Sequence, residues 1–92
     1  MMTKLEEIVL EWVCLDYERL PDILAPVSSD LGRQVTGGEV WGVLLAHLER
    51  GVVKAYLYQD GMRRFTPLPH PAGHDPEEVW WYITEEGKNV LV

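Results

Sequence analysis

The chain has 92 residues, of which 47% are hydrophobic and 25% charged, a balance typical of a single globular domain. Fifteen acidic against eight basic residues give a net charge of −7, which disfavours nucleic acid as a partner because nucleic-acid-binding domains are usually basic. The single cysteine, Cys14, excludes an internal disulfide framework and a cysteine-based zinc motif, and it fits a reducing, cytoplasmic setting.

A first helix is predicted over about residues 3–15. Thr3 and Glu6 have the spacing of a capping box, in which each side chain accepts a hydrogen bond from the other residue's amide. Apolar residues then recur at helical spacing and form one stripe, made of Leu5, Ile8, Val9, Trp12, Val13 and Leu15. Leu10 and Cys14 fall on the opposite arc, so we expect both side chains at the surface.

A second helix is predicted within about residues 18–31. Pro21 fits its first turn, whereas Pro26 falls in the interior and is expected to kink or split the helix, because proline has no amide hydrogen. Gly32 ends the helix. Gln34 and Val35 then provide only a stub of strand.

A third helix is predicted over about residues 37–50. Thr36 and Glu39 form a second capping box at its start, and Gly51 ends it. His47 lies on the side that carries the apolar residues, where it is expected to be a partly buried, hydrogen-bonded histidine. The outward face consists of Glu39, Gly42, Ala46, Glu49 and Arg50.

Two strands are predicted at about residues 52–58 and 78–84, joined by a long loop over about residues 59–77. Trp80 and Trp81 are neighbours on a strand, so they point to opposite faces and only one of them can face the core. Tyr56 and Tyr58 share one face of the other strand and are placed to flank the outer tryptophan. A short helical turn follows Thr84.

The segments Leu44–Tyr56 and Trp81–Lys88 resemble the end of the recognition helix and the second wing strand of bacterial winged-helix proteins. With the Asp16–Glu18 start of the second helix, the resemblance covers most of the chain. It implies one α+β winged-helix domain over residues 1–92, with a three-helix core, a two- to three-stranded antiparallel sheet and an enlarged wing loop. The chain resembles small, stand-alone winged-helix proteins of bacteria, many of them without an assigned role.

The resemblance also implies DNA binding, with the third helix in the major groove and the wing along the backbone. That alternative would use six residues: Glu39, Gly42, Ala46 and Arg50 on the helix, and Arg63 and Arg64 on the wing. Two carboxylates, Glu39 and Glu49, would face the phosphates, and Gly42 and Ala46 cannot reach a base edge. DNA binding is therefore the second hypothesis.

The leading hypothesis is a non-enzymatic recognition module that contacts a protein partner or a second copy of the chain. Tryptophan and tyrosine are favoured at protein interfaces, and small residues allow close approach of another element. The candidate interface residues are Leu10, Cys14, Gly42, Ala46, Trp80 and Trp81. An alternative for the outer aromatic surface is that the long wing folds back and covers it.

Other chemistry has little support in the sequence. His70 and His74 are separated by Pro71 and Gly73, so no helix aligns them and no metal site is expected. Ser28–Asp30 is better explained as a helix end than as a nucleophile with a base, so we expect no enzyme and no cofactor. The longest nearly apolar stretch is about half the ~20 residues of a membrane span, so no membrane partner is expected.

Overall fold

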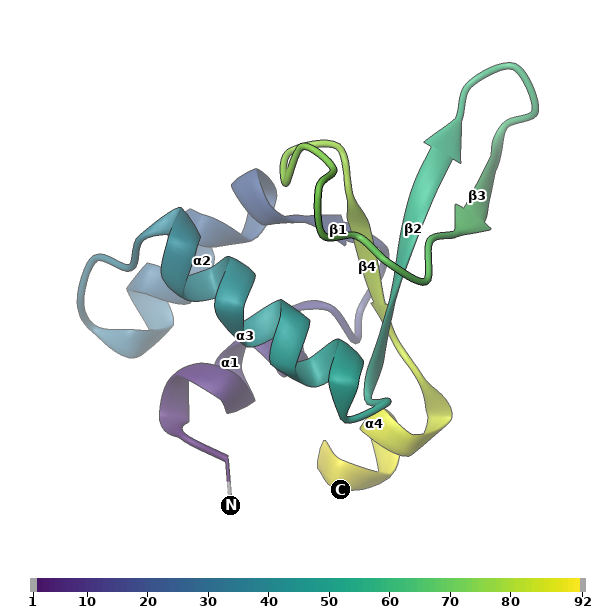
Figure 1. The fold of residues 1–92 in the computed structure, drawn as a ribbon. Coiled ribbons are helices and arrows are strands. Elements are labelled where there is room, and N and C mark those ends of the chain that lie inside the picture. Colours follow the sequence, from purple (N-terminus) through teal and green to yellow (C-terminus); the bar gives the residue numbers. More distant parts are fainter. Residues whose placement is uncertain (1, 92) are drawn as a thin grey trace.

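The computed structural model describes residues 2–91, and within them it has four helices and one four-stranded antiparallel sheet (Figure 1). The α+β class predicted from the sequence is confirmed. The elements in chain order are α1 Lys4–Trp12, β1 Glu18–Arg19, α2 Leu20–Leu31, α3 Gly37–Glu49, β2 Val53–Gln59, β3 Arg64–Pro67, β4 Trp80–Ile83 and α4 Glu85–Leu91.

Both predicted capping boxes are present. At the start of α1, Glu6 Oε1 accepts from the Thr3 amide at 2.8 Å, and Thr3 Oγ1 accepts from the Glu6 amide at 3.2 Å. At the start of α3, Glu39 Oε2 and Thr36 Oγ1 make the same exchange at 2.8 and 3.1 Å. These bonds satisfy amides that have no partner inside the helix, so they fix where each helix begins.

The helix ends differ from the prediction. α1 stops at Trp12 and not near Leu15, with Val13 as its C-cap. α2 begins at Leu20 and runs without a break to Leu31, so Pro26 does not split it. Gly32 ends α2 in the left-handed conformation, with φ 81°, as a residue without Cβ readily does.

The sheet has the strand order β1-β4-β2-β3. β1 pairs with β4, as Glu18 lies opposite Trp81 and Arg19 opposite Trp80. The predicted stub strand at Gln34 and Val35 is wrong, because the Val35 amide instead donates to Ser28 Oγ at 3.0 Å.

The wing is more structured than predicted, because it contains β3, which pairs with the outer half of β2. Tyr56 is where the two ladders of β2 meet, since it pairs with Trp80 of β4 and with Pro67 of β3. β4 pairs with β2 from Val53 to Tyr56, and β3 pairs with it from Tyr56 to Gln59. The hairpin of β2 and β3 therefore projects beyond the rest of the sheet (Figure 1).

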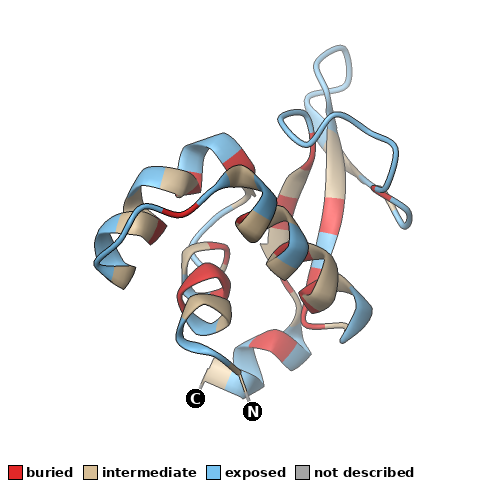
Figure 2. Cartoon of the chain, turned by 60° about the vertical axis from the view of Figure 1, so that its left-hand side comes forward, coloured by how far each residue is buried: buried red, intermediate tan, exposed pale blue. Residues whose placement is uncertain are grey.

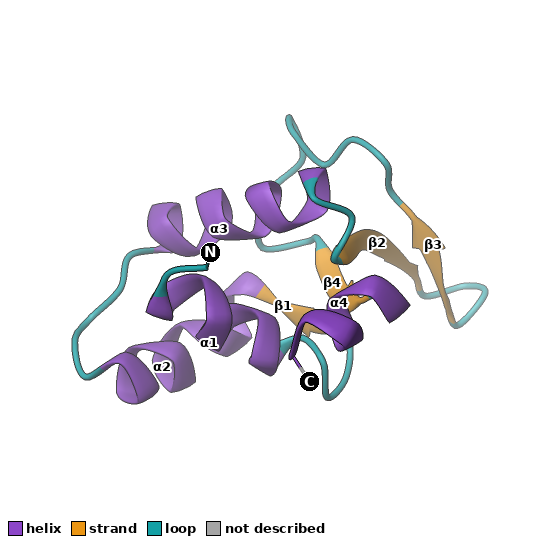
Figure 3. Cartoon of the chain, turned by 90° about the horizontal axis from the view of Figure 1, so that it is seen from below, coloured by secondary structure: helices purple, strands orange, loops and turns teal. Residues whose placement is uncertain are grey.

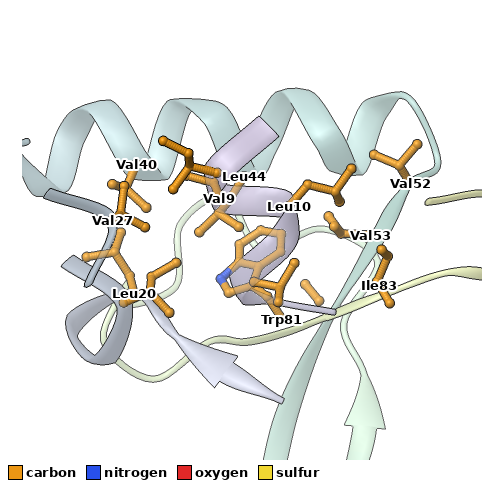
Figure 4. Close-up of a cluster of buried hydrophobic side chains, with 14 of the residues drawn as sticks. Val9, Leu10, Leu20, Val27, Val40, Leu44, Val52, Val53, Trp81 and Ile83 are labelled. Carbon is orange, nitrogen blue, oxygen red and sulfur yellow. The ribbon is translucent and has the colours of Figure 1, made fainter. Parts of the chain in front are cut away.

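The hydrophobic core lies between the sheet and helices α1–α3, which gather on one side of it (Figure 3). Figure 4 shows Trp81 near the middle of this core, with Val9 and Leu10 of α1 and Leu44 of α3 around it. Trp81 also meets the ring of Trp41 edge to face, with the centroids 5.6 Å apart. Exposed residues concentrate on the projecting hairpin and the following loop (Figure 2).

Candidate functional site

The face of the sheet opposite the core carries a cluster of aromatic rings, which we call the outer aromatic face. It consists of Tyr17, Tyr56, Tyr58, Phe65, Trp80 and Tyr82. Directly paired residues of antiparallel strands point to the same face, and neighbours along a strand to opposite faces. The pairing of Tyr56 with Trp80 and of Tyr58 with Phe65 thus places these four rings together, while Trp81 points into the core.

Tyr17, in the segment before β1, lies across the sheet and joins the strands. Its ring is parallel to that of Phe65, with centroids 3.8 Å apart, and is stacked on Tyr82 at 4.8 Å. Tyr56 meets Tyr17 edge to face at 5.1 Å. One residue from the helical half of the chain therefore bridges three strands of the sheet.

Two cations flank the rings. The guanidinium of Arg19 lies 5.1 Å from the Trp80 ring centroid, and the Lys88 ammonium lies 6.0 Å from that of Tyr82. Both distances are within the usual range of cation–π attraction. Each cation also has an acidic neighbour, since Arg19 pairs with Asp22 at 3.2 Å and Lys88 with Glu85 at 3.5 Å.

The rings of the outer aromatic face are partly exposed to solvent. Tyr58 is 40% exposed, and the other five are half-buried. Partial burial among the rings raises the pKa of the Tyr56 phenol, because its charged form loses water. Four tyrosines of this face, at positions 17, 56, 58 and 82, carry hydroxyls that donate and accept hydrogen bonds.

The two tryptophans bear out the prediction that only one faces the core. Trp81 is 0% exposed and so, contrary to the expectation, has no surface for contact with a partner. Trp80 is half-buried on the outer face, with Tyr58 at 6.4 Å as predicted. Tyr17 and Phe65 were missed. The only sequence signal for Phe65 is that it and Thr66 are strand-favouring residues side by side within β3.

The expected outward position of Leu10 is wrong. Its side chain is 0% exposed because α1 packs against α2 and α3 and also against α4, so that its buried arc is wider than one stripe. Cys14 is half-buried just beyond α1, and its thiol donates to the Glu11 carbonyl at 2.9 Å. Cys14 lines a groove of about 480 Å³, which we call the acidic groove, together with Glu7, Glu11, Trp12, Leu15, Asp30 and Leu91.

The outward face of α3 has few long side chains that could contact a DNA base or a partner. Gly42 is exposed, and a Cβ built there would meet nothing within 4 Å. Ala46 is half-buried. Glu39 caps its own helix and pairs with Arg33 at 3.1 Å, while Arg50 pairs with Glu6 at 2.8 Å. Hydrogen bonds from the Thr3 amide and from Arg50 lower the pKa of the Glu6 carboxyl to about 2.

Arg63 and Arg64 lie at the tip of the hairpin, far from α3. Arg63 has a φ of 49° in the turn, and Arg64 opens β3. Both side chains are exposed, and neither makes an ion pair within the part of the chain that the structure describes.

His47 is fully buried, and its Nε2 donates to the Glu6 carbonyl at 2.8 Å. His70 and His74 are exposed in the loop before β4. Across residues 2–91, no three His, Cys, Asp or Glu side chains are grouped as a metal site would need. Ser28 lies in the last turn of α2, where its hydroxyl accepts from Val35.

Comparisons of the chain with known protein families, with curated proteins and with solved structures gave no match. None of the helices in residues 2–91 has the length and apolar character needed to cross a membrane.

Proposed function

We propose that the protein is a winged-helix recognition module without enzymatic activity, which acts in the cytoplasm through protein contacts made by its outer aromatic face. The element order supports the winged-helix assignment: β1 lies between α1 and α2, and it pairs with β4, which in turn pairs with β2. Strand β3 is then an addition within the wing.

The observation that carries the proposal is the half-exposed ring cluster on the open face of the sheet. Aromatic side chains give large contact areas at a low cost in rotamer freedom, and tyrosine adds a hydroxyl for hydrogen bonds. Stacking of Tyr17 between Phe65 and Tyr82 holds these rings in place before any partner binds. A preorganised surface binds more tightly because less motion is lost on binding.

A site-specific photo-crosslinker in place of Tyr58 tests the proposal in cells. We expect a discrete adduct with a protein, and we expect Trp80→Ala in the same chain to remove it. The matched control places the crosslinker at Ser29, an exposed residue of α2. Adducts of equal yield at both positions, or an adduct that survives Trp80→Ala, would contradict the assignment of this face.

DNA binding is the second candidate function, because Arg63 and Arg64 are exposed at the tip of the wing without an acidic partner in the described residues. It predicts binding to random duplex DNA at an ionic strength of about 0.05 M that weakens steeply with added salt. Arg63→Glu with Arg64→Glu would then abolish the binding. The absence of binding at low salt would leave the protein-contact proposal as the one that stands.

A further inference from the structure

The acidic groove combines an apolar floor with a rim of carboxylates. Trp12, Leu15 and Leu91 line it, and Leu15, at 75%, is the most exposed large hydrophobic side chain in residues 2–91. The groove has a volume of about 480 Å³, and Glu7, Glu11 and Asp30 place three negative charges along it. No lysine or arginine lines it. Asp30 Oδ2 is held in place by a hydrogen bond from Trp12 Nε1 at 2.8 Å.

The tip of the β2–β3 hairpin has the complementary character. Met62 is 57% exposed there, and it is followed by Arg63 and Arg64, which make no ion pair within residues 2–91. Methionine is unbranched and flexible, so it fits irregular apolar spaces. The tip thus presents one apolar side chain and two positive charges, against an apolar floor and three negative charges.

We infer that the acidic groove binds the hairpin tip of a second copy of this chain, with Met62 against the apolar floor and Arg63 and Arg64 against the carboxylates. The contact is intermolecular, because the tip lies at the far end of the molecule from α1 in both Figures 1 and 3. It shares the protein-contact character of the proposed function but uses different surfaces, so each can fail without the other.

The charge distribution favours a second copy as the occupant. The chain carries a net charge of −7, so random contacts between copies are repelled, and attraction requires that a local positive group meet a local negative one. The tip and the groove are different surfaces. Two copies can therefore exchange tips reciprocally as a closed dimer, or join head to tail with one tip and one groove left for closure into a ring or for further addition.

Charge exchange between tip and groove tests the inference directly. The tip variant carries Arg63→Glu and Arg64→Glu, and the groove variant carries Glu7→Lys and Glu11→Lys, all at exposed positions. Sedimentation velocity should show concentration-dependent association of the wild type that weakens roughly tenfold or more as salt rises from about 0.05 to about 0.5 M. Each variant alone should sediment as a monomer, because its tip and groove then carry like charges.

An equimolar mixture of the two variants should associate again, because every tip then finds a groove of opposite charge. This recovery also shows that both variants are folded. Lys54→Glu, which changes the charge as Arg64→Glu does but lies outside the tip, should leave the association within about twofold of wild type. Trp80→Ala should leave it unchanged as well. A wild type that stays monomeric at low salt, or a mixture that stays monomeric, would overturn the inference.

Discussion

His47 Nε2 donates a hydrogen bond to the backbone carbonyl of Glu6, with 2.8 Å between the two atoms, and so ties the middle of the chain to the first helix. The ring is 0% exposed, and its Nδ1 has no partner within the described residues. Loss of water in the buried site lowers the pKa of His47. The nearby Arg50 lowers it further, against the opposing effects of the Glu6 carbonyl and carboxylate.

This burial predicts that the free energy of unfolding falls as the pH drops below about 6.5, the value for an unfolded histidine. There the unfolded chain binds a proton that the folded chain does not, so lower pH favours unfolding by up to about 1.4 kcal/mol per pH unit. Urea unfolding between about pH 8 and 5.5 measures this slope. His47→Gln should flatten the slope of the free energy of unfolding against pH, whereas the control His74→Gln, in an exposed loop, should not. If the slope persists in His47→Gln, another group causes the pH dependence.

The neighbouring tryptophans should differ sharply in their contribution to stability. Trp81→Ala removes a fully buried ring and its contact with Trp41, so we expect a loss of about 3–5 kcal/mol in the free energy of unfolding. Trp80→Ala removes a half-buried ring and should cost about 1–2 kcal/mol. Chemical denaturation of both variants checks the order. Equal losses in the free energy of unfolding would mean that Trp80 is as well buried as Trp81.

Gly87 and Gly42 form a second matched pair. A Cβ at Gly87 would overlap the Val52 carbonyl oxygen and lie 2.6 Å from Ile83 Cγ1, so Gly87→Ala should destabilise the fold by about 1–3 kcal/mol. A Cβ at Gly42 meets nothing within 4 Å. Gly42→Ala should therefore stabilise α3 by about 0.5–1 kcal/mol, the usual difference between alanine and glycine in a helix. Thermal unfolding of the two variants should show shifts of opposite sign.

Tyr17 should stabilise the hairpin through its ring and not through its hydroxyl. Tyr17→Ala removes the stack with Phe65 and Tyr82 and is expected to cost about 1–2 kcal/mol. Tyr17→Phe keeps the stack and should change the free energy of unfolding by less than about 0.5 kcal/mol. Near-ultraviolet circular dichroism, which reports fixed aromatic rings, should weaken in the first variant and persist in the second. A large loss in Tyr17→Phe would assign the effect to the hydroxyl.

The parts of the fold that could be predicted rest on local chemistry. Thr3 and Thr36 mark helix starts because a capping box is complete within four residues, and Gly32 marks a helix end through its left-handed backbone. The opposite orientations of Trp80 and Trp81 follow from the pleat of a strand alone.

The parts that could not be predicted depend on contacts between distant segments. Leu10 lies off the apolar stripe of α1, and its burial follows from the packing of α1 against α2, α3 and α4, which no local spacing indicates. β1 is a strand because two residues of β4, far along the chain, pair with it. The stack of Tyr17 on Phe65 joins residues 48 positions apart, which no sequence spacing indicates.

Strand β2 changes its partner from β4 to β3 at Tyr56, so the sheet has two parts that can open separately. Toward the core, β2 is held by β4 and by the packed interior, whereas beyond Tyr56 it is held by β3. Amide hydrogens of Val53–Tyr56 should therefore exchange with solvent only when the whole domain unfolds, and those of Leu57–Gln59 through a smaller, separate opening. Such an opening of the wing has to break the stack of Phe65 on Tyr17, while the domain beneath stays folded.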